Sequence, residues 1–251
     1  MDLKEEFNAA YATALSKEGF VYNKKYDMHV RFVNGELFQY IRYMKRPWYR
    51  RGYKEFTVYA GIVSVYAYSL LKKELTQCGN GLSGYAALLF GVPGVEQSYA
   101  YNNENMKELI ELSLEQTCKY IVPVFNQVAD LDSYIEFCKE IEIELLRGAD
   151  KYDRGQNDAL VLIQAENHDD FEDFFHKCLD FDMKTRKELT GTIEEGYYEA
   201  EYDLMYDGII ESIAKARDIV YNNPKLYAEA LEELKRRKEA NLATLKRNGV
   251  I

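Results

Sequence analysis

The chain has 251 residues, of which 47% are hydrophobic and 29% charged, with only four prolines. This composition is typical of folded proteins and unlike that of disordered chains. Its net charge of −10 argues against general nucleic-acid binding, which depends on lysines and arginines that neutralise phosphates.

The N-terminus lacks the basic and then apolar order of a secretory signal. No apolar run approaches the roughly 20 residues that span a bilayer. The four cysteines stand far apart and form neither a zinc knuckle nor a redox pair: Cys78, Cys118, Cys138 and Cys178. Isolated thiols suit a reducing compartment, so we expect a cytoplasmic protein that contacts no membrane.

Charge is distributed unevenly along the chain. Residues 1–56 contain eleven Lys/Arg and seven Asp/Glu, a net charge of +4, which leaves −14 for residues 57–251. We therefore expect the two parts of the chain to differ in electrostatic character.

An amphipathic helix is predicted over residues 2–18, because apolar side chains recur there every three or four residues. Gly19 follows, and glycine readily adopts the left-handed backbone conformation that ends many helices. We expect the helix to end at Gly19 and an extended segment to begin at Phe20.

Three strands are predicted next, at about Tyr26–Val33, Glu36–Met44 and Phe56–Tyr66. Apolar residues alternate with polar ones in the first strand, where we expect His29 on the solvent side. Asn34-Gly35 favours a tight type I′ hairpin between the first two strands. Consecutive strands with apolar residues on both faces indicate an antiparallel meander that helices cover on both sides.

The remainder is predicted to be mainly helical, after a glycine-rich loop at 76–101 with a short fourth strand at 85–90. Helices are expected at about 105–121, 132–147, 168–189, 194–221 and 225–247. The segment 158–166 fits either a helix or a strand, with helix favoured. Pro123 should kink or end the helix at 105–121.

Two of these helices carry capping signals at their starts. Asn105 precedes Glu108, and Ser133 precedes Glu136, by the three residues of a capping box. We expect Asn105 and Ser133 to be the N-cap residues.

The predicted fold class is therefore α+β. We expect an antiparallel β-meander of three to four strands packed by helices in a domain at 1–150. A mostly α-helical region at 151–251, which ends in a helical hairpin, follows a linker at 151–157.

Three stretches of the N-terminal part carry a family resemblance: Glu18-Gly19-Phe20, Phe38-Gln39-Tyr40-Ile41 and Phe56-Thr57-Val58-Tyr59-Ala60-Gly61-Ile62. They resemble the bacterial family known as domain of unknown function 4304, over about the first 65 residues and more weakly to about 147. The resemblance implies an uncharacterised α+β domain of bacterial type. It transfers no activity and no catalytic residue.

The segment 40–54 is rich in basic and aromatic residues and contains no acidic one. Its candidate anion-binding residues are Arg42, Lys45, Arg46, Trp48, Arg50 and Arg51. Guanidinium groups match carboxylate and phosphate oxygens, and aromatic rings offer stacking faces to a base. The alternative is a solvated loop whose arginines pair with the protein's own carboxylates.

Two further patterns fall short of a cofactor or metal site. Residues 79–84 read G-x-G-x-x-G, but no parallel strand is predicted before them, so we expect a flexible turn and no nucleotide cofactor. His168 and His176 share one helical face with Glu172, yet two helical turns separate them by about 12 Å. One ion cannot reach both. A half-site of Glu172 and His176 would need ligands from elsewhere, so we predict no metal site.

The segment 194–207 combines tyrosines with carboxylates at helical spacing. The residues proposed for a partner surface are Tyr198, Glu199, Tyr202, Asp203 and Tyr206. Tyrosine beside acid suits recognition of a basic protein. The alternative is an aromatic packing stripe next to a solvated acidic stripe.

No catalytic residue set can be assembled from the sequence, because three histidines offer too few candidates. One hypothesis is a non-catalytic interaction protein, of the adaptor or immunity-like kind, that presents an acidic, tyrosine-rich helical surface to a basic partner. The alternative is an enzyme or sensor that binds a small anion or nucleotide at residues 42–54. The oligomeric state is left open.

Overall fold

A computed structural model describes residues 2–46, 54–66, 98–134, 136–137 and 218–251, and the structural statements below concern these residues. They fall into two units. The first unit includes the described parts of 1–64, 75–133 and 243–251, and the second includes those of 65–74 and 134–242. The predicted boundary near residue 150 lies outside the described residues, and the division at that point stays a prediction.

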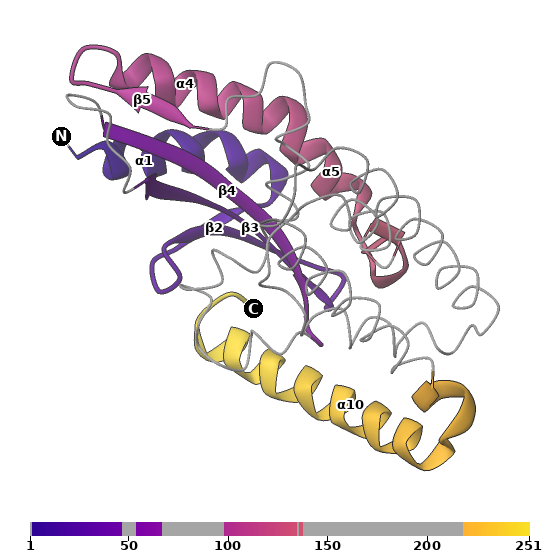
Figure 1. Ribbon diagram of the computed structural model, residues 1–251. Coiled ribbons are helices and arrows are strands. Elements are labelled where there is room, and N and C mark those ends of the chain that lie inside the picture. The colour runs from indigo at the N-terminus through magenta and orange to yellow at the C-terminus, as the bar shows by residue number, and fades with distance from the viewer. Residues whose placement is uncertain (1, 47–53, 67–97, 135, 138–217) are drawn as a thin grey trace, which may run out of the picture. The chain divides into compact units, whose positions relative to one another are not determined.

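The first unit is built on a five-stranded antiparallel sheet in the order β1-β2-β3-β4-β5 (Figure 1). Its strands are β1 (Val21–Asn23), β2 (Met28–Val33), β3 (Leu37–Arg46), β4 (Lys54–Ser64) and β5 (Tyr99–Tyr101). With the helices, this sheet confirms the α+β class and the antiparallel meander. The predicted strand at 85–90 lies outside the described residues.

The β2–β3 hairpin confirms the predicted tight turn. Asn34 and Gly35 both have positive φ, 50° and 74°, as a type I′ turn requires. The Glu36 amide donates a hydrogen bond of 3.0 Å to the Val33 carbonyl. Val33 pairs with Leu37 in the sheet, so Glu36 is an extra residue on the return side of the turn.

The first helix, α1 (Leu3–Leu15), continues into the 3-10 turn η1 (Ser16–Glu18). Gly19 then adopts a φ of 80°, and the Phe20 amide donates to the Leu15 carbonyl at 3.1 Å. This is the glycine-ended helix that the sequence predicted.

Pro123 causes the predicted break in the next helix. The α-helix α4 (Met106–Gln116) widens into the π-helical turn η3 (Thr117–Ile121) and resumes as α5 (Val122–Gln127). Proline has no amide hydrogen and its ring clashes with the carbonyl four residues earlier in a regular α-helix. The wider π turn removes that clash, so the chain continues in a helical path.

Asn105 is the N-cap residue of α4, as predicted, but the capping-box hydrogen bond is not formed, and the second predicted capping box is wrong. Asn105 precedes α4, but its side-chain oxygen accepts from the Asn102 amide at 2.7 Å and not from the helix. Residues 131–134 are already helical, and Asp130 accepts from the Ser133 amide at 2.9 Å. Asp130 is therefore the cap, and Ser133 returns a hydrogen bond by accepting from the Asp130 amide at 3.1 Å.

The helices α1, α4 and α5 pack on one face of the sheet. The Phe7 ring of α1 stacks on Tyr11 with centroids 3.8 Å apart and meets Phe56 of β4 edge-on at 6.1 Å. On the same face, Gln39 of β3 donates to the Phe125 carbonyl at 2.9 Å and the Val128 carbonyl at 2.8 Å. This buried amide satisfies carbonyls at the end of α5, which the helix itself cannot do.

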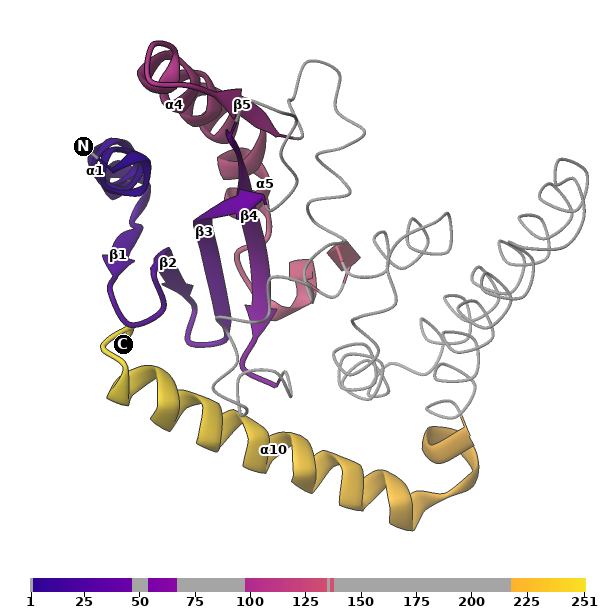
Figure 2. The same cartoon turned by 60° about the vertical axis from the view of Figure 1, so that its left-hand side comes forward.

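The last helix, α10 (Pro224–Arg247), ends in the same way as α1. Gly249 has a φ of 69°, and the Val250 amide donates to the Leu245 carbonyl at 3.0 Å. The C-terminus lies beside the β1–β2 turn (Figure 2), where Asn23 donates to the Asn248 carbonyl at 2.9 Å. Among the described helices, none is both long and apolar enough to cross a membrane.

Candidate functional site

The predicted anion site is only partly described, and its described residues diverge. Trp48, Arg50 and Arg51 lie outside the described residues, and of Arg46 the backbone alone is described, paired with Glu55. Arg42 and Lys45 are three residues apart on β3, so their side chains leave opposite faces of the sheet. The hairpin therefore does not bring these two cations together.

Lys45 has a closer basic neighbour on its own face. Lys45 pairs with Phe56 of β4, and Lys54 precedes Phe56 by two residues, so both lysines point to the same side. Both are exposed. Sequence proximity had not singled out this pair, because it depends on the strand register.

The predicted partner surface lies outside the described residues, since all of its members fall within 198–206. The same holds for the G-x-G-x-x-G segment at 79–84 and for the histidine-containing segment at 168–176. These predictions stay untested.

An acidic surface does appear on α4. Three of its exposed residues follow each other at helical spacing, and we call them the α4 acidic face: Glu108, Glu111 and Glu115. Leu112, 36% exposed, adjoins them, while Lys107 and Lys119 stand towards the two ends of the segment. This surface was not predicted, although the i, i+3, i+7 spacing of its glutamates places them on one side of a helix.

Buried hydroxyls hold α4 against α1 on the side opposite to this acidic face. The Tyr11 hydroxyl lies 3.0 Å from the hydroxyls of both Ser113 and Thr117, and all three side chains are buried. Ser113 in turn donates to the Ile110 carbonyl, and Thr117 to the Ser113 carbonyl, each at 2.8 Å. Burial raises the pKa of Tyr11 well above its ordinary value, so this hydroxyl stays protonated and serves as a structural tie.

His29 of β2 lies on the helix-covered face, which makes the predicted solvent-side position wrong. Its side chain is 1% exposed, and its ring lies 5.9 Å from the Tyr11 ring and 5.1 Å from the Tyr22 ring. Strand alternation correctly placed His29 on the face of β2 opposite to Met28 and Val30. It did not predict that α1 covers the face that carries His29. Burial lowers the pKa of His29 from 6.5 to about 4.

A short chain of polar side chains borders His29. The Tyr22 hydroxyl donates to the Asp27 carboxylate at 2.6 Å and accepts from the side-chain amide of Asn8 at 3.2 Å. Lys4 of α1 pairs with the same carboxylate at 2.5 Å. Burial and the hydrogen bond to Asp27 raise the pKa of Tyr22 to about 12.

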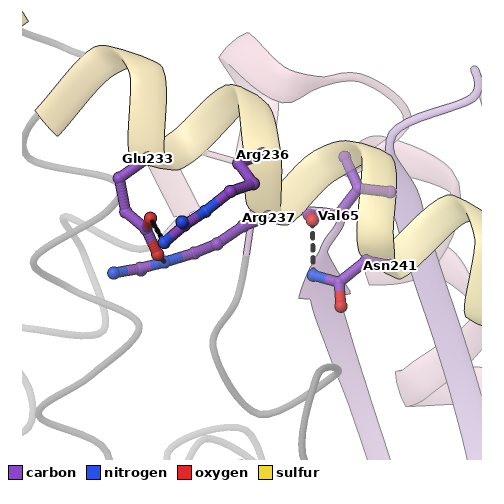
Figure 3. Close-up of polar contacts among 5 residues, drawn as sticks. All are labelled: Val65, Glu233, Arg236, Arg237 and Asn241. Carbon is purple, nitrogen blue, oxygen red and sulfur yellow. Dashed lines mark hydrogen bonds and ion pairs between the residues drawn. The ribbon is translucent and has the colours of Figure 1, made fainter. Parts of the chain in front are cut away.

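The polar contacts of α10 in the second unit are structural (Figure 3). Glu233 pairs with Arg236 and Arg237 on the next turn, and the hydrogen bond from Arg237 lowers the pKa of this carboxyl. Asn241 is fully buried and donates to the Val65 carbonyl at 2.7 Å. The amide therefore fixes the helix to the chain segment that follows β4.

The solvent side of α10 mixes both signs of charge. Its exposed charged residues share one face of the helix: Lys225, Glu229, Glu232, Lys235, Arg236, Glu239, Lys246 and Arg247. Alternation of this kind is typical of a solvated helix, and it contrasts with the run of glutamates on α4.

Within the described ranges, no group of three or more His, Cys, Asp and Glu side chains is placed to hold a metal ion. The polar clusters described above are instead satisfied mostly by one another. Comparisons with protein-family models, curated proteins and solved structures find no significant match to this chain, so the resemblance to domain of unknown function 4304 stays a prediction.

Proposed function

We propose that this protein is a non-catalytic interaction protein, of the adaptor or immunity-like kind, that binds a basic partner through acidic helical surface. The observation that carries the proposal is the α4 acidic face, with three exposed glutamates in line and Leu112 beside them. Charge complementarity steers such a surface to a basic partner, and an adjoining apolar side chain adds contact area.

The charge distribution of the whole chain supports the same reading. Residues 57–251, which include α4, carry a net charge of −14. A field of that sign raises the rate at which a basic protein encounters the surface. The tyrosine-rich segment at 194–207 would offer an acidic surface of its own if it folds as the sequence predicts.

The buried hydrogen bonds that hold α4 against α1 also support a docking role for α4. Tyr11, Ser113 and Thr117 fix the inner side of the helix by buried hydrogen bonds. A rigidly held helix presents its outer residues with little loss of entropy on binding.

The proposal is tested by capturing partners from a lysate of the source cells with two variants of equal charge. The first variant changes the α4 acidic face, Glu108→Gln, Glu111→Gln and Glu115→Gln. The second changes three exposed glutamates of α10, Glu229→Gln, Glu232→Gln and Glu239→Gln. Both raise the net charge by three, so non-specific electrostatics changes equally.

We expect one stoichiometric partner of basic composition that the unchanged protein and the α10 variant retain at low salt and release as salt rises. The α4 variant should lose it. Equal retention by both variants, or no partner at all, would count against the proposal.

A second candidate function is a sensor or enzyme that binds a small anion or nucleotide at residues 42–54. The exposed pair Lys45 and Lys54, on one face of the β3–β4 hairpin, favours it because two cations on one side suit a phosphate group. Pyrophosphate should then raise the melting temperature of the unchanged protein but not of the variant Lys45→Gln, Lys54→Gln.

A further inference from the structure

The buried histidine of β2 is an unusual feature of the first unit. His29 is 1% exposed, and neither ring nitrogen has a hydrogen-bond partner in the structure of the described residues. Buried polar groups are nearly always hydrogen-bonded, since an unpaired one costs free energy. An exception inside a well-packed layer therefore asks for an explanation.

The ring lies at the point where α1 meets the sheet. It sits between Tyr11 of α1 and Tyr22 of β1, with centroid distances of 5.9 and 5.1 Å. Around it, α1 is tied to the sheet by contacts near its N-terminal end, from Asn8 to Tyr22 and from Lys4 to Asp27. A change in the charge of His29 therefore affects the packing of α1 before that of other elements.

In the described part of the chain, few ionisable groups near His29 could stabilise a positive charge there. Tyr11 and Tyr22 are neutral, because burial raises the pKa of each. Asp27, in the β1–β2 turn, favours the charged form of His29 only in part and already pairs with Lys4. Arg31, two residues along the same face of β2, is itself a cation and offers no counter-charge to an imidazolium.

We propose that His29 is an acid-sensitive latch: its protonation loosens α1 from the sheet and uncovers the strands beneath. The neutral imidazole packs between two aromatic rings as an apolar group would. The imidazolium has two N–H donors and a charge, and among the described residues neither ring nitrogen meets a hydrogen-bond acceptor or an ion-pair partner.

The direction of the effect follows from proton binding. Burial lowers the pKa of His29 from 6.5 to about 4, so below pH 6.5 an exposed His29 binds a proton that the packed one does not. Acid therefore favours the open state, and the closed state is fully favoured only above pH 6.5. Between pH 7 and pH 5, the opening equilibrium should shift roughly twenty-fold.

Hydrogen exchange of the full chain, corrected for the intrinsic effect of pH, tests the latch. In the unchanged protein, the protection of the α1 amides should fall roughly twenty-fold from pH 7 to pH 5, relative to the amides of β3 and β4. The variant His29→Gln, which cannot titrate, should show no such change. A control variant with His168→Gln and His176→Gln leaves His29 as the remaining histidine and should respond as the unchanged protein does.

Nuclear magnetic resonance of the control variant gives a second readout that does not depend on the folding of His29→Gln. The single imidazole should titrate well below pH 6 in the folded protein. An ordinary titration near pH 6.5, α1 protection that does not respond to pH, or an equal response in His29→Gln would each overturn the proposal.

Discussion

The hydroxyl of Tyr11 offers a direct measure of how firmly α4 is held. It contacts the hydroxyls of Ser113 and Thr117 at 3.0 Å in a fully buried setting, while its ring fills the space between Phe7 and His29. The substitution Tyr11→Phe removes the hydroxyl and keeps the ring. We expect the free energy of unfolding, measured by urea denaturation, to fall by about 1–2 kcal/mol.

Tyr59 of β4 provides the matched control for this change. It is half-buried on the opposite face of the sheet, and Tyr59→Phe removes the same hydroxyl. A loss of stability in Tyr59→Phe as large as that in Tyr11→Phe would mean that the contacts with α4 are not responsible.

For single residues, the sequence predicted the burial of apolar side chains better than the burial of polar ones. Strand alternation placed the apolar partners of the sheet correctly, because burial of apolar area dominates the choice of face. His29 and Gln39 were not recognised as buried, because their burial depends on what α1 and α5 place over them. Such polar groups are specified by distant segments that local periodicity does not report.

Among the elements, the end of the first helix at Gly19 was predicted correctly. Gly19 has a φ of 80°, and a methyl group there would meet the Arg31 side chain only at an ordinary 3.5 Å. The cost of Gly19→Ala is therefore conformational, and we expect a loss of about 1 kcal/mol in thermal or urea denaturation.

Gly249 provides a control that separates the conformational cost of a glycine-to-alanine substitution from its steric cost. It has a φ of 69° with open space where a methyl group would lie, so Gly249→Ala should destabilise by a similar amount. A much larger loss in Gly19→Ala would point to a clash with Arg31 instead.

The elements that the sequence missed are short or depend on register. The strands β1 and β5 have three residues each, too few for alternation to show. The true cap at Asp130 was missed because Ser133 has the same local signature and lies three residues later. Of the candidate sites, the basic residues of β3 were identified, but their division between two faces required the pairing with β4.

At the scale of the whole chain, residues 243–251 belong to the same unit as the first strands and contact the β1–β2 turn. Asn23 donates to the carbonyl of Asn248, and the Asn248 side chain donates to the Tyr26 hydroxyl at 2.5 Å. Deletion of residues 248–251 removes both contacts and the turn that closes α10. We expect a lower melting temperature and a loss on the order of 2 kcal/mol in the free energy of unfolding.

A double-mutant cycle distinguishes this contact from a general effect of shortening the chain. Asn23→Ala alone should destabilise, because its side chain also accepts from the amides of Lys25 and Tyr26. In the combined variant the losses should fall short of additivity, since the shared hydrogen bond is lost only once. Strict additivity would show that the deletion acts elsewhere.

The position of Asn23 also bears on how the protein is made. Its acceptors at Asn248 and Gly249 come 225 and 226 residues later, so a long stretch of chain must be synthesised after Asn23 before they exist. A nascent chain can form its first hairpins early, but the contact from the β1–β2 turn waits until Asn248 and Gly249 have emerged. A product that terminates before Asn248 would lack this contact, which gives cellular proteases a structural difference by which to tell it from a chain that contains residues 248 and 249.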